Sequence, residues 1–160
     1  MGKALSHHWN LHNEQDTLSW GQRFSGFLKP GLVVSLVGEL GAGKTTLTRG
    51  VLLGLGYTGR VKSPTYPILE TYSLSRFYFY HFDFYRICDK NELEDSGFRE
   101  NFGGSGVCFV EWPDKAQDWL KNVDINIKIN MLESSRELII EALSEAGVLC
   151  LENWQKLGWQ

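Results

Sequence analysis

The feature that most constrains the fold of this chain is a glycine-rich octapeptide that runs from Gly38 to Thr45. Its sequence, Gly-Glu-Leu-Gly-Ala-Gly-Lys-Thr, matches the phosphate-binding-loop pattern G-x-x-x-x-G-K-[ST] at every position. The apolar run 32–37 precedes it, and apolar residues at helical spacing follow it over 45–53. A buried strand, a tight turn and a helix therefore occur in the order that this motif requires, which makes a chance glycine turn the poorer interpretation.

Each residue type in the octapeptide suits a bound polyphosphate. Gly38, Gly41 and Gly43 allow backbone angles that other residues avoid, so that consecutive amide N–H groups can surround phosphate oxygens. The helix that begins near Lys44 adds the positive end of its dipole, and the lysine adds a charge beside the β- and γ-phosphates. The Thr45 hydroxyl is the group that ligates magnesium in this pattern. The sequence thus predicts ATP or a related nucleotide and Mg²⁺ as ligands.

The bulk composition limits the class of protein. A chain of 160 residues with 42% hydrophobic content suits one core, so we expect residues 1–160 to form a single domain. The net charge of −3 argues against a protein that coats nucleic acid, because that affinity needs clustered Lys and Arg. Cys88, Cys108 and Cys150 follow no disulfide spacing and predict reduced thiols in the cytoplasm, with the last two in the core. No apolar stretch has the length of a signal peptide or membrane span.

The residues before the octapeptide predict a strand or extended arm and then a helix. The arm reaches Leu11, and Asn13 is a suitable cap for a helix from about 13 to 28. Trp9 is expected either to line a base pocket or to cover the sheet.

Two later apolar runs each end in an acid. The run 76–83 ends at Asp83 and, with the run 68–74, predicts an antiparallel strand pair. The run 106–111 ends at Glu111. Phosphate-loop proteins hold magnesium or its water with such an acid, which makes Asp83 the Walker B candidate, although Asp also begins turns. The two acids together could share the handling of metal-bound water and nucleophilic water.

A proline-containing segment, Ser63-Pro64-Thr65, precedes these runs. Pro64 keeps the preceding residue extended, which predicts a surface loop. In phosphoryl-transfer proteins a loop at this place often brings a threonine to the γ-phosphate and metal. On the residues alone, Thr65 is equally well a switch residue or part of a plain turn.

The C-terminal third is predicted to be mostly strand. Alternating apolar and polar residues over 123–131, and apolar runs over 136–143 and 147–151, predict a meander of antiparallel strands with one solvent-exposed face. Short helices are expected over 91–102 and around 114–120. With the strand–loop–helix unit, these elements predict an α/β fold of the P-loop NTPase type: a mixed sheet with a parallel core, flanked by antiparallel strands and helices.

Four linked motifs resemble the TsaE family, the bacterial ATPases of tRNA threonylcarbamoyladenosine synthesis. They are Gly38–Gly50, Ser63–Tyr66, His81–Arg86 and Glu111–Pro113, in this order and spacing, and the resemblance covers nearly the whole chain. It implies an ATPase that binds a TsaB–TsaD pair and, by ATP hydrolysis, supports N6-threonylcarbamoylation of adenosine 37 in tRNAs reading codons that begin with A. It also implies contact with tRNA only through the complex. We expect the chain alone to be a monomer.

The same resemblance implies roles for individual residues. Thr45 and Glu111 resemble magnesium ligands, and Asp83 resembles the essential Walker B acid beside the metal. Thr65 lies in the switch-like loop, and Trp112 matches a tryptophan needed for activity; with Asp83 and Glu111 they form the expected catalytic set. The expected nucleotide contacts come from the N-terminal arm, the loop and the C-terminal strands: Leu11, Gly38, Glu39, Leu40, Gly41, Ala42, Gly43, Lys44, Thr45, Thr46 and Arg136.

Three other functions could use the same loop. A small-molecule or nucleoside kinase needs an arginine-rich lid and a second substrate pocket, and a GTP-dependent switch needs an N-K-x-D motif; the sequence shows none of these. A nucleotide-gated binding module, in which hydrolysis is incidental, uses the same residues as the ATPase, so the sequence does not separate the two. An arginine finger that is missing from the chain can be supplied by a partner.

Overall fold

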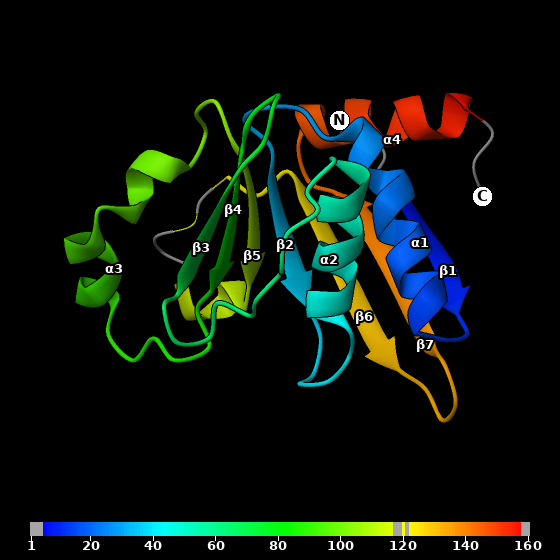
Figure 1. Cartoon of the computed structure of the whole chain (residues 1–160), viewed down its shortest axis with the longest axis horizontal. Coiled ribbons are helices and arrows are strands. Elements are labelled where there is room, and N and C mark those ends of the chain that lie inside the picture. Colours follow the sequence, from blue (N-terminus) through cyan, green and yellow to red (C-terminus); the bar gives the residue numbers. More distant parts are fainter. Residues whose placement is uncertain (1–4, 117–119, 121, 158–160) are drawn as a thin grey trace.

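One mixed sheet forms the centre of the molecule (Figure 1). The structure is a computed structural model that describes residues 5–116, 120 and 122–157. In these ranges the sheet has seven strands in the spatial order β1-β7-β6-β2-β5-β4-β3. Their bounds are β1 (Ser6–Leu11), β2 (Val33–Val37), β3 (Leu69–Ser73), β4 (Tyr78–Asp83), β5 (Val107–Glu111), β6 (Ile125–Met131) and β7 (Arg136–Ala142).

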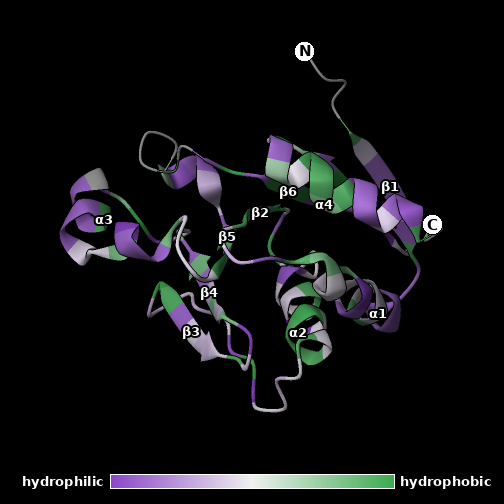
Figure 2. Ribbon diagram, turned by 90° about the horizontal axis from the view of Figure 1, so that it is seen from above, coloured by the Kyte–Doolittle hydropathy of each residue, from purple (hydrophilic) through white to green (hydrophobic). Residues whose placement is uncertain are grey.

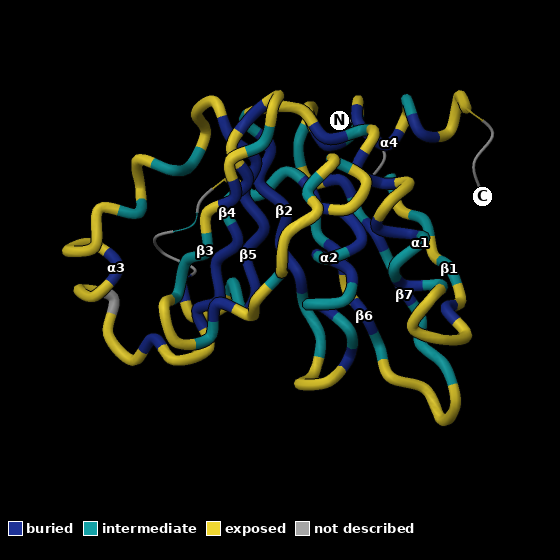
Figure 3. The backbone as a smooth tube through the Cα atoms, viewed as in Figure 1, coloured by how far each residue is buried: buried dark blue, intermediate teal, exposed yellow. Residues whose placement is uncertain are grey.

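The middle of this sheet is parallel and its two sides are antiparallel. β2 pairs in parallel with β5 and with β6, and β5 pairs in parallel with β4. β3 runs antiparallel to β4, β7 to β6, and β1 to β7. The near-continuous burial of β2 and β5 is typical of parallel strands that are covered on both faces (Figure 3). The predicted α/β fold is therefore confirmed.

The helices cover the sheet and its ends. They are α1 (Glu14–Phe24), α2 (Lys44–Gly54), α3 (Lys90–Ser96) and α4 (Glu145–Lys156), with 3₁₀ turns η1 (Ser25–Phe27), η2 (Phe98–Asn101) and η3 (Pro113–Ala116). Figure 1 shows α1 and α2 side by side over one face, and Figure 2 shows the same layers from above, with hydrophobic segments in β2, α2 and α4. None of the helices in the described ranges has the length and hydropathy to cross a membrane.

The N-terminal helix begins where the sequence predicts. The Asn13 side chain accepts a hydrogen bond from the Asp16 backbone N–H at 2.9 Å, which caps α1. The predicted segment 13–28 divides into α1 and the 3₁₀ turn η1. Likewise, the helix expected over 91–102 divides at Gly97 into α3 and η2, and the one expected around 114–120 is the turn η3, with 117–119 outside the described residues.

One predicted strand is wrong: residues 147–151 lie in α4. The Ser144 side chain caps this helix by accepting from the Gly147 backbone N–H at 3.0 Å. The buried residues Gly147, Cys150, Leu151 and Trp154 recur at helical spacing and face the core. An apolar run of only a few residues does not separate strand from helix, and here the helical period becomes visible only when Trp154 is included.

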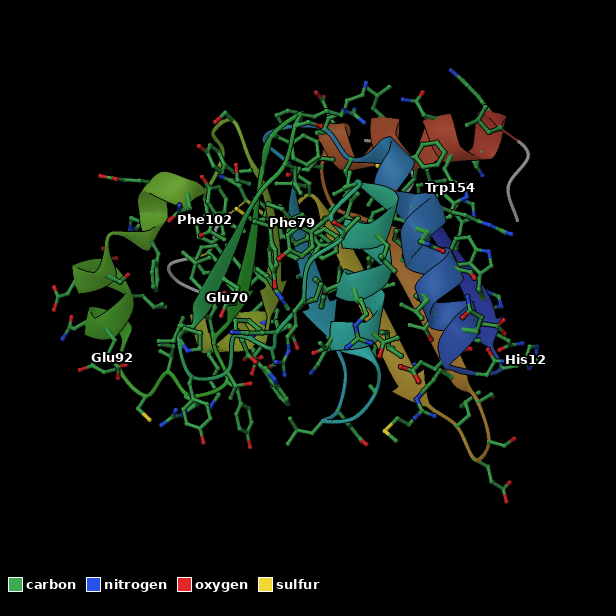
Figure 4. The ribbon with its side chains drawn as sticks, viewed as in Figure 1. His12, Glu70, Phe79, Glu92, Phe102 and Trp154 are labelled. Atoms are coloured by element: carbon green, nitrogen blue, oxygen red, sulfur yellow. The ribbon has the colours of Figure 1, made fainter. Side chains whose placement is uncertain are left out.

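An aromatic group joins α4 to the rest of the core. Trp154, which Figure 4 labels, has its ring centroid 5.4 Å from that of Trp9 and 5.1 Å from that of Trp20. Phe24 and Phe27 complete the group, with centroids 5.4 and 5.2 Å from Trp154. Of the two alternatives for Trp9, the structure therefore supports a residue that covers the sheet. A second core, under α3 and η2, packs against the opposite face.

Candidate active site

The phosphate-binding octapeptide connects β2 to α2, as the motif predicts. Gly41 and Gly43 have φ angles of +82° and +111°, a left-handed region that glycine adopts without strain. Gly38 is not in that region, but a Cβ there would lie 2.8 Å from the carbonyl oxygen of Ile129 on β6. The three glycines therefore serve two purposes, because two of them shape the loop and one permits its close approach to the sheet.

Lys44 lies in the middle of the site. Its Nζ donates to the Gly38 carbonyl oxygen at 2.6 Å, lies 3.9 Å from Glu111 Oε1, and stands 4.3 Å from the centroid of the Trp112 ring. Only 6% of the residue is exposed. Burial lowers the pKa of this ammonium group, while the negative charges of Glu111 and Asp83 act in the opposite direction. The lysine thus connects the loop to the ends of β4 and β5.

The two predicted acids lie side by side. The parallel register of β4 and β5 pairs Asp83 with Glu111, and each residue is 4% exposed. Asp83 Oδ1 accepts from the Tyr85 backbone N–H at 2.9 Å, and Oδ2 accepts from the Thr65 hydroxyl at 3.3 Å. Burial raises the pKa of Asp83, the hydrogen bond from Tyr85 opposes that shift, and the charge of Glu111 adds to it. The strand ends therefore bring together the pair that the sequence predicts.

Two strained residues flank these acids. Ile68 and Trp112 have φ angles of +70° and +56°, and no other non-glycine residue in the described part of the chain has a positive φ. The Ile68 carbonyl oxygen accepts from the Asp83 backbone N–H at 2.9 Å, and Trp112 directly follows Glu111. Together with the contact from Thr65 to Asp83, this means that segment 63–68 is hydrogen-bonded to Asp83 and is not an isolated turn.

His81 is a site residue that the sequence reasoning missed. It is fully buried, and its Nε2 lies 2.6 Å from Glu111 Oε2. It precedes Asp83 by two positions on β4, so both side chains point to the same face of the sheet. That spacing was the available signal, but the partner of His81 is 30 positions away, on a neighbouring strand.

The oxygen atoms at this place suit magnesium. Thr45 lies in the first turn of α2 and supplies a hydroxyl, and Asp83 and Glu111 supply carboxylates, which are the hard donors that this ion prefers. The two buried carboxyl groups also lie side by side, where a bound cation would offset their mutual repulsion. No group of three or more His, Cys, Asp or Glu side chains able to hold an ion is found within the described ranges.

A cavity of about 380 Å³ opens beside the loop. It brings together residues that are far apart in the sequence, because Leu11 on β1 pairs with Arg136 on β7. Arg136 Nε donates to the Ala42 carbonyl oxygen at 3.2 Å, so its guanidinium group braces the loop. The lining residues are Leu11, His12, Asn13, Glu14, Thr17, Gly41, Ala42, Gly43, Thr46, Ser134, Ser135 and Arg136.

Not every predicted nucleotide contact lies in this cavity. Glu39 and Leu40 occupy the exposed tip of the loop, with Leu40 65% exposed. If they contact a phosphate, the contact can come only from their backbone N–H groups.

Comparisons with known proteins show the family to which the chain belongs. A family model described as "Threonylcarbamoyl adenosine biosynthesis protein TsaE" matches residues 11–138, a range that contains every site residue described above. The chain belongs to the TsaE family. The tRNA threonylcarbamoyladenosine biosynthesis protein TsaE of Haemophilus influenzae is 40% identical over 142 residues, which cover 86% of this chain and 90% of that protein.

Further TsaE relatives span the chain almost completely. The protein of the same name from Bacillus subtilis is 39% identical over 146 residues, covering 90% of this chain and 91% of the relative. The crystal structure of Bacillus subtilis YdiB superposes with a TM-score of 0.84 and 30% identity over 99% of both chains. The mixed sheet of this TsaE chain is therefore shared with a solved structure along its whole length.

Proposed function

We propose that this TsaE chain is a magnesium-dependent ATPase of tRNA threonylcarbamoyladenosine biosynthesis, and that it acts together with a TsaB–TsaD pair. The observation that carries the proposal is the convergence of a complete phosphate-binding loop with Lys44, Asp83 and Glu111 at the carboxyl ends of β2, β4 and β5. Ligands of open α/β sheets bind at this edge. Membership of the TsaE family supports the place in tRNA modification.

Each residue has a distinct task in this proposal. The loop amides and Lys44 bind the β- and γ-phosphates, and the adenosine occupies the cavity beside Leu11 and Arg136. Thr45 and Glu111 hold the magnesium ion, which when bound neutralises charge on the phosphates. Asp83 lies next to Glu111 and is hydrogen-bonded to Thr65, so it can orient a water molecule near the γ-phosphate.

The surface around the phosphate-binding loop has exposed apolar side chains of the kind that bind a partner protein. Exposed hydrophobic side chains surround the carboxyl edge of the sheet: Leu40 (65% exposed), Tyr66 (82%), Tyr85 (42%), Met131 (45%) and Leu132 (47%). In Figure 1 the phosphate-binding loop and the hairpin between β6 and β7 project from this same edge. Clustered exposed apolar side chains mark interaction sites. A TsaB–TsaD pair that binds here would cover the nucleotide and could supply an arginine in trans.

The experiment measures ATP hydrolysis and multiple-turnover tRNA modification, each with and without TsaB–TsaD. The variants are Asp83→Asn and Glu111→Gln, with Glu152→Gln as a control, because that acid is exposed on α4, away from the phosphate-binding loop. We expect the partners to raise hydrolysis, the two buried-acid variants to lose hydrolysis and repeated modification while still binding ATP, and the control to match the wild type. Modification at the wild-type rate without hydrolysis would instead favour a nucleotide-gated binding module.

A further inference from the structure

A buried imidazole contacts Glu111, one member of the acid pair. His81 has no exposed surface, and its Nε2 lies 2.6 Å from Glu111 Oε2. Its Nδ1 has no hydrogen-bond partner in the part of the chain that the structure describes. An ionised carboxylate oxygen can only accept, so in this contact the Nε2–H donates to Glu111.

Because of this hydrogen bond, the two oxygens of Glu111 have different partners. Oε2 lies 2.6 Å from His81 Nε2, whereas Oε1 lies 3.9 Å from Nζ of Lys44, the lysine of the phosphate-binding loop. A glutamate side chain has three rotatable bonds, and a fixed carboxylate requires that its free rotamers be excluded. The hydrogen bond from His81 restricts these rotamers and leaves Oε1 without a hydrogen bond to the histidine.

Packing alone does not account for a histidine at this position. Phe79 lies two residues earlier on β4, on the same face and also fully buried, and fills its place with carbon atoms only (Figure 4). A histidine introduces a buried nitrogen, Nδ1, that remains without a partner and therefore costs stability. Among the described contacts of His81, the hydrogen bond to Glu111 is the interaction that can offset this cost in stability.

We propose that His81 is a positioning residue that orients Glu111 toward the metal through its Nε2–H. The inference rests on the proposed function in one respect, namely that Glu111 is a magnesium ligand. Partners of this kind, which bind a metal-ligating side chain rather than the metal, typically contribute 10–100-fold to metal affinity. His81 itself contacts neither nucleotide nor metal in this arrangement.

The test compares three variants by their binding of ATP in EDTA and in Mg²⁺. His81→Gln keeps an N–H donor near the place of Nε2, His81→Leu has similar bulk without a donor, and Phe79→Leu disturbs the same strand without touching Glu111. We expect the leucine variant at 81 to bind ATP normally in EDTA but to lose about tenfold or more of the affinity gained from Mg²⁺. The glutamine variant should keep most of that gain, and Phe79→Leu should keep all of it despite a lower melting temperature.

The possible failures are distinguishable. If His81→Leu retains the gain, or if Phe79→Leu loses it equally, His81 is structural and the inference falls while the proposed function stands. If wild-type affinity does not respond to Mg²⁺, Glu111 is not a ligand, and the inference and the metal role fall together. If the affinity responds but ATP is not hydrolysed, only the proposed hydrolysis fails. A ¹⁵N spectrum of the metal-free protein gives a separate reading, and a His81 ring that carries its proton on Nδ1 overturns the inference.

Discussion

The packing of α2 against α1 predicts that Gly50→Ala destabilises the protein. In an isolated helix this change would stabilise by up to about 1 kcal/mol, because glycine is a poor helix former. Here, however, a Cβ at position 50 would lie 2.3 Å from the carbonyl oxygen of Leu18, a backbone atom of α1 that has no rotamer by which to move away. The helices must separate, and overpacking of this kind costs about 1–3 kcal/mol.

The assay is thermal unfolding of Gly50→Ala beside Gly26→Ala, both without nucleotide. A loss of 1 kcal/mol lowers the melting temperature of a chain of this length by about 2–4 °C, so we expect a decrease of about 2–12 °C at position 50. At position 26 a Cβ meets no atom within 4 Å, and we expect a change within about 0.5 kcal/mol. An unchanged or raised melting temperature for Gly50→Ala would refute the reasoning that the close approach of the two helices outweighs helix propensity.

Three further predictions concern charge, thiols and the loop. Because burial raises the pKa of Asp83 above its ordinary 3.8, its stabilising contribution is present below about pH 4 and is lost as the pH rises through the raised pKa. As the pH rises from about 4 through the raised pKa, the free energy of unfolding of the metal-free wild type should therefore fall relative to that of Asp83→Asn, as measured by denaturant titration. A difference between the two proteins that stays constant with pH would contradict this. Burial raises the pKa of the Cys108 and Cys150 thiols to about 12, so a thiol reagent should label only the exposed Cys88 before unfolding and all three cysteines after it. Arg136 donates a hydrogen bond to a carbonyl of the phosphate-binding loop, and hydrogen bonds from charged groups typically contribute about 1.5–3 kcal/mol. Arg136→Gln should therefore weaken ATP binding about tenfold or more. Wild-type affinity of this variant in calorimetry would exclude that role.

The local motifs of the sequence predicted the centre of the fold. A strand, a glycine loop and a helix in succession define one unit, and apolar runs that end in Asp83 and Glu111 predict acids at the edge where that loop lies. The structure places both acids in direct register on neighbouring parallel strands. This worked because the carboxyl ends of parallel strands meet at one edge, so that strand type alone fixes the approximate position.

The contacts that no local motif predicted depend on long-range register. His81 meets Glu111 because β4 lies beside β5, and Arg136 reaches Ala42, 94 positions away, because β7 and β1 close that side of the sheet. No local pattern contains either pairing. The strand prediction for 147–151 was wrong for a different reason: a short apolar run has too few residues to distinguish a period of two from one of 3.6.

The central claim is that the loop, Thr45 and the two buried acids form one magnesium–nucleotide site. The most direct measurement is a crystal structure of the chain with Mn²⁺ and a non-hydrolysable ATP analogue, in which anomalous scattering locates the metal. The account predicts a metal peak within ligand distance of the Thr45 hydroxyl and the Glu111 carboxylate, with Asp83 beside it and the adenosine in the cavity lined by Leu11 and Arg136. A nucleotide bound elsewhere, or a metal peak remote from both Thr45 and Glu111, would contradict it.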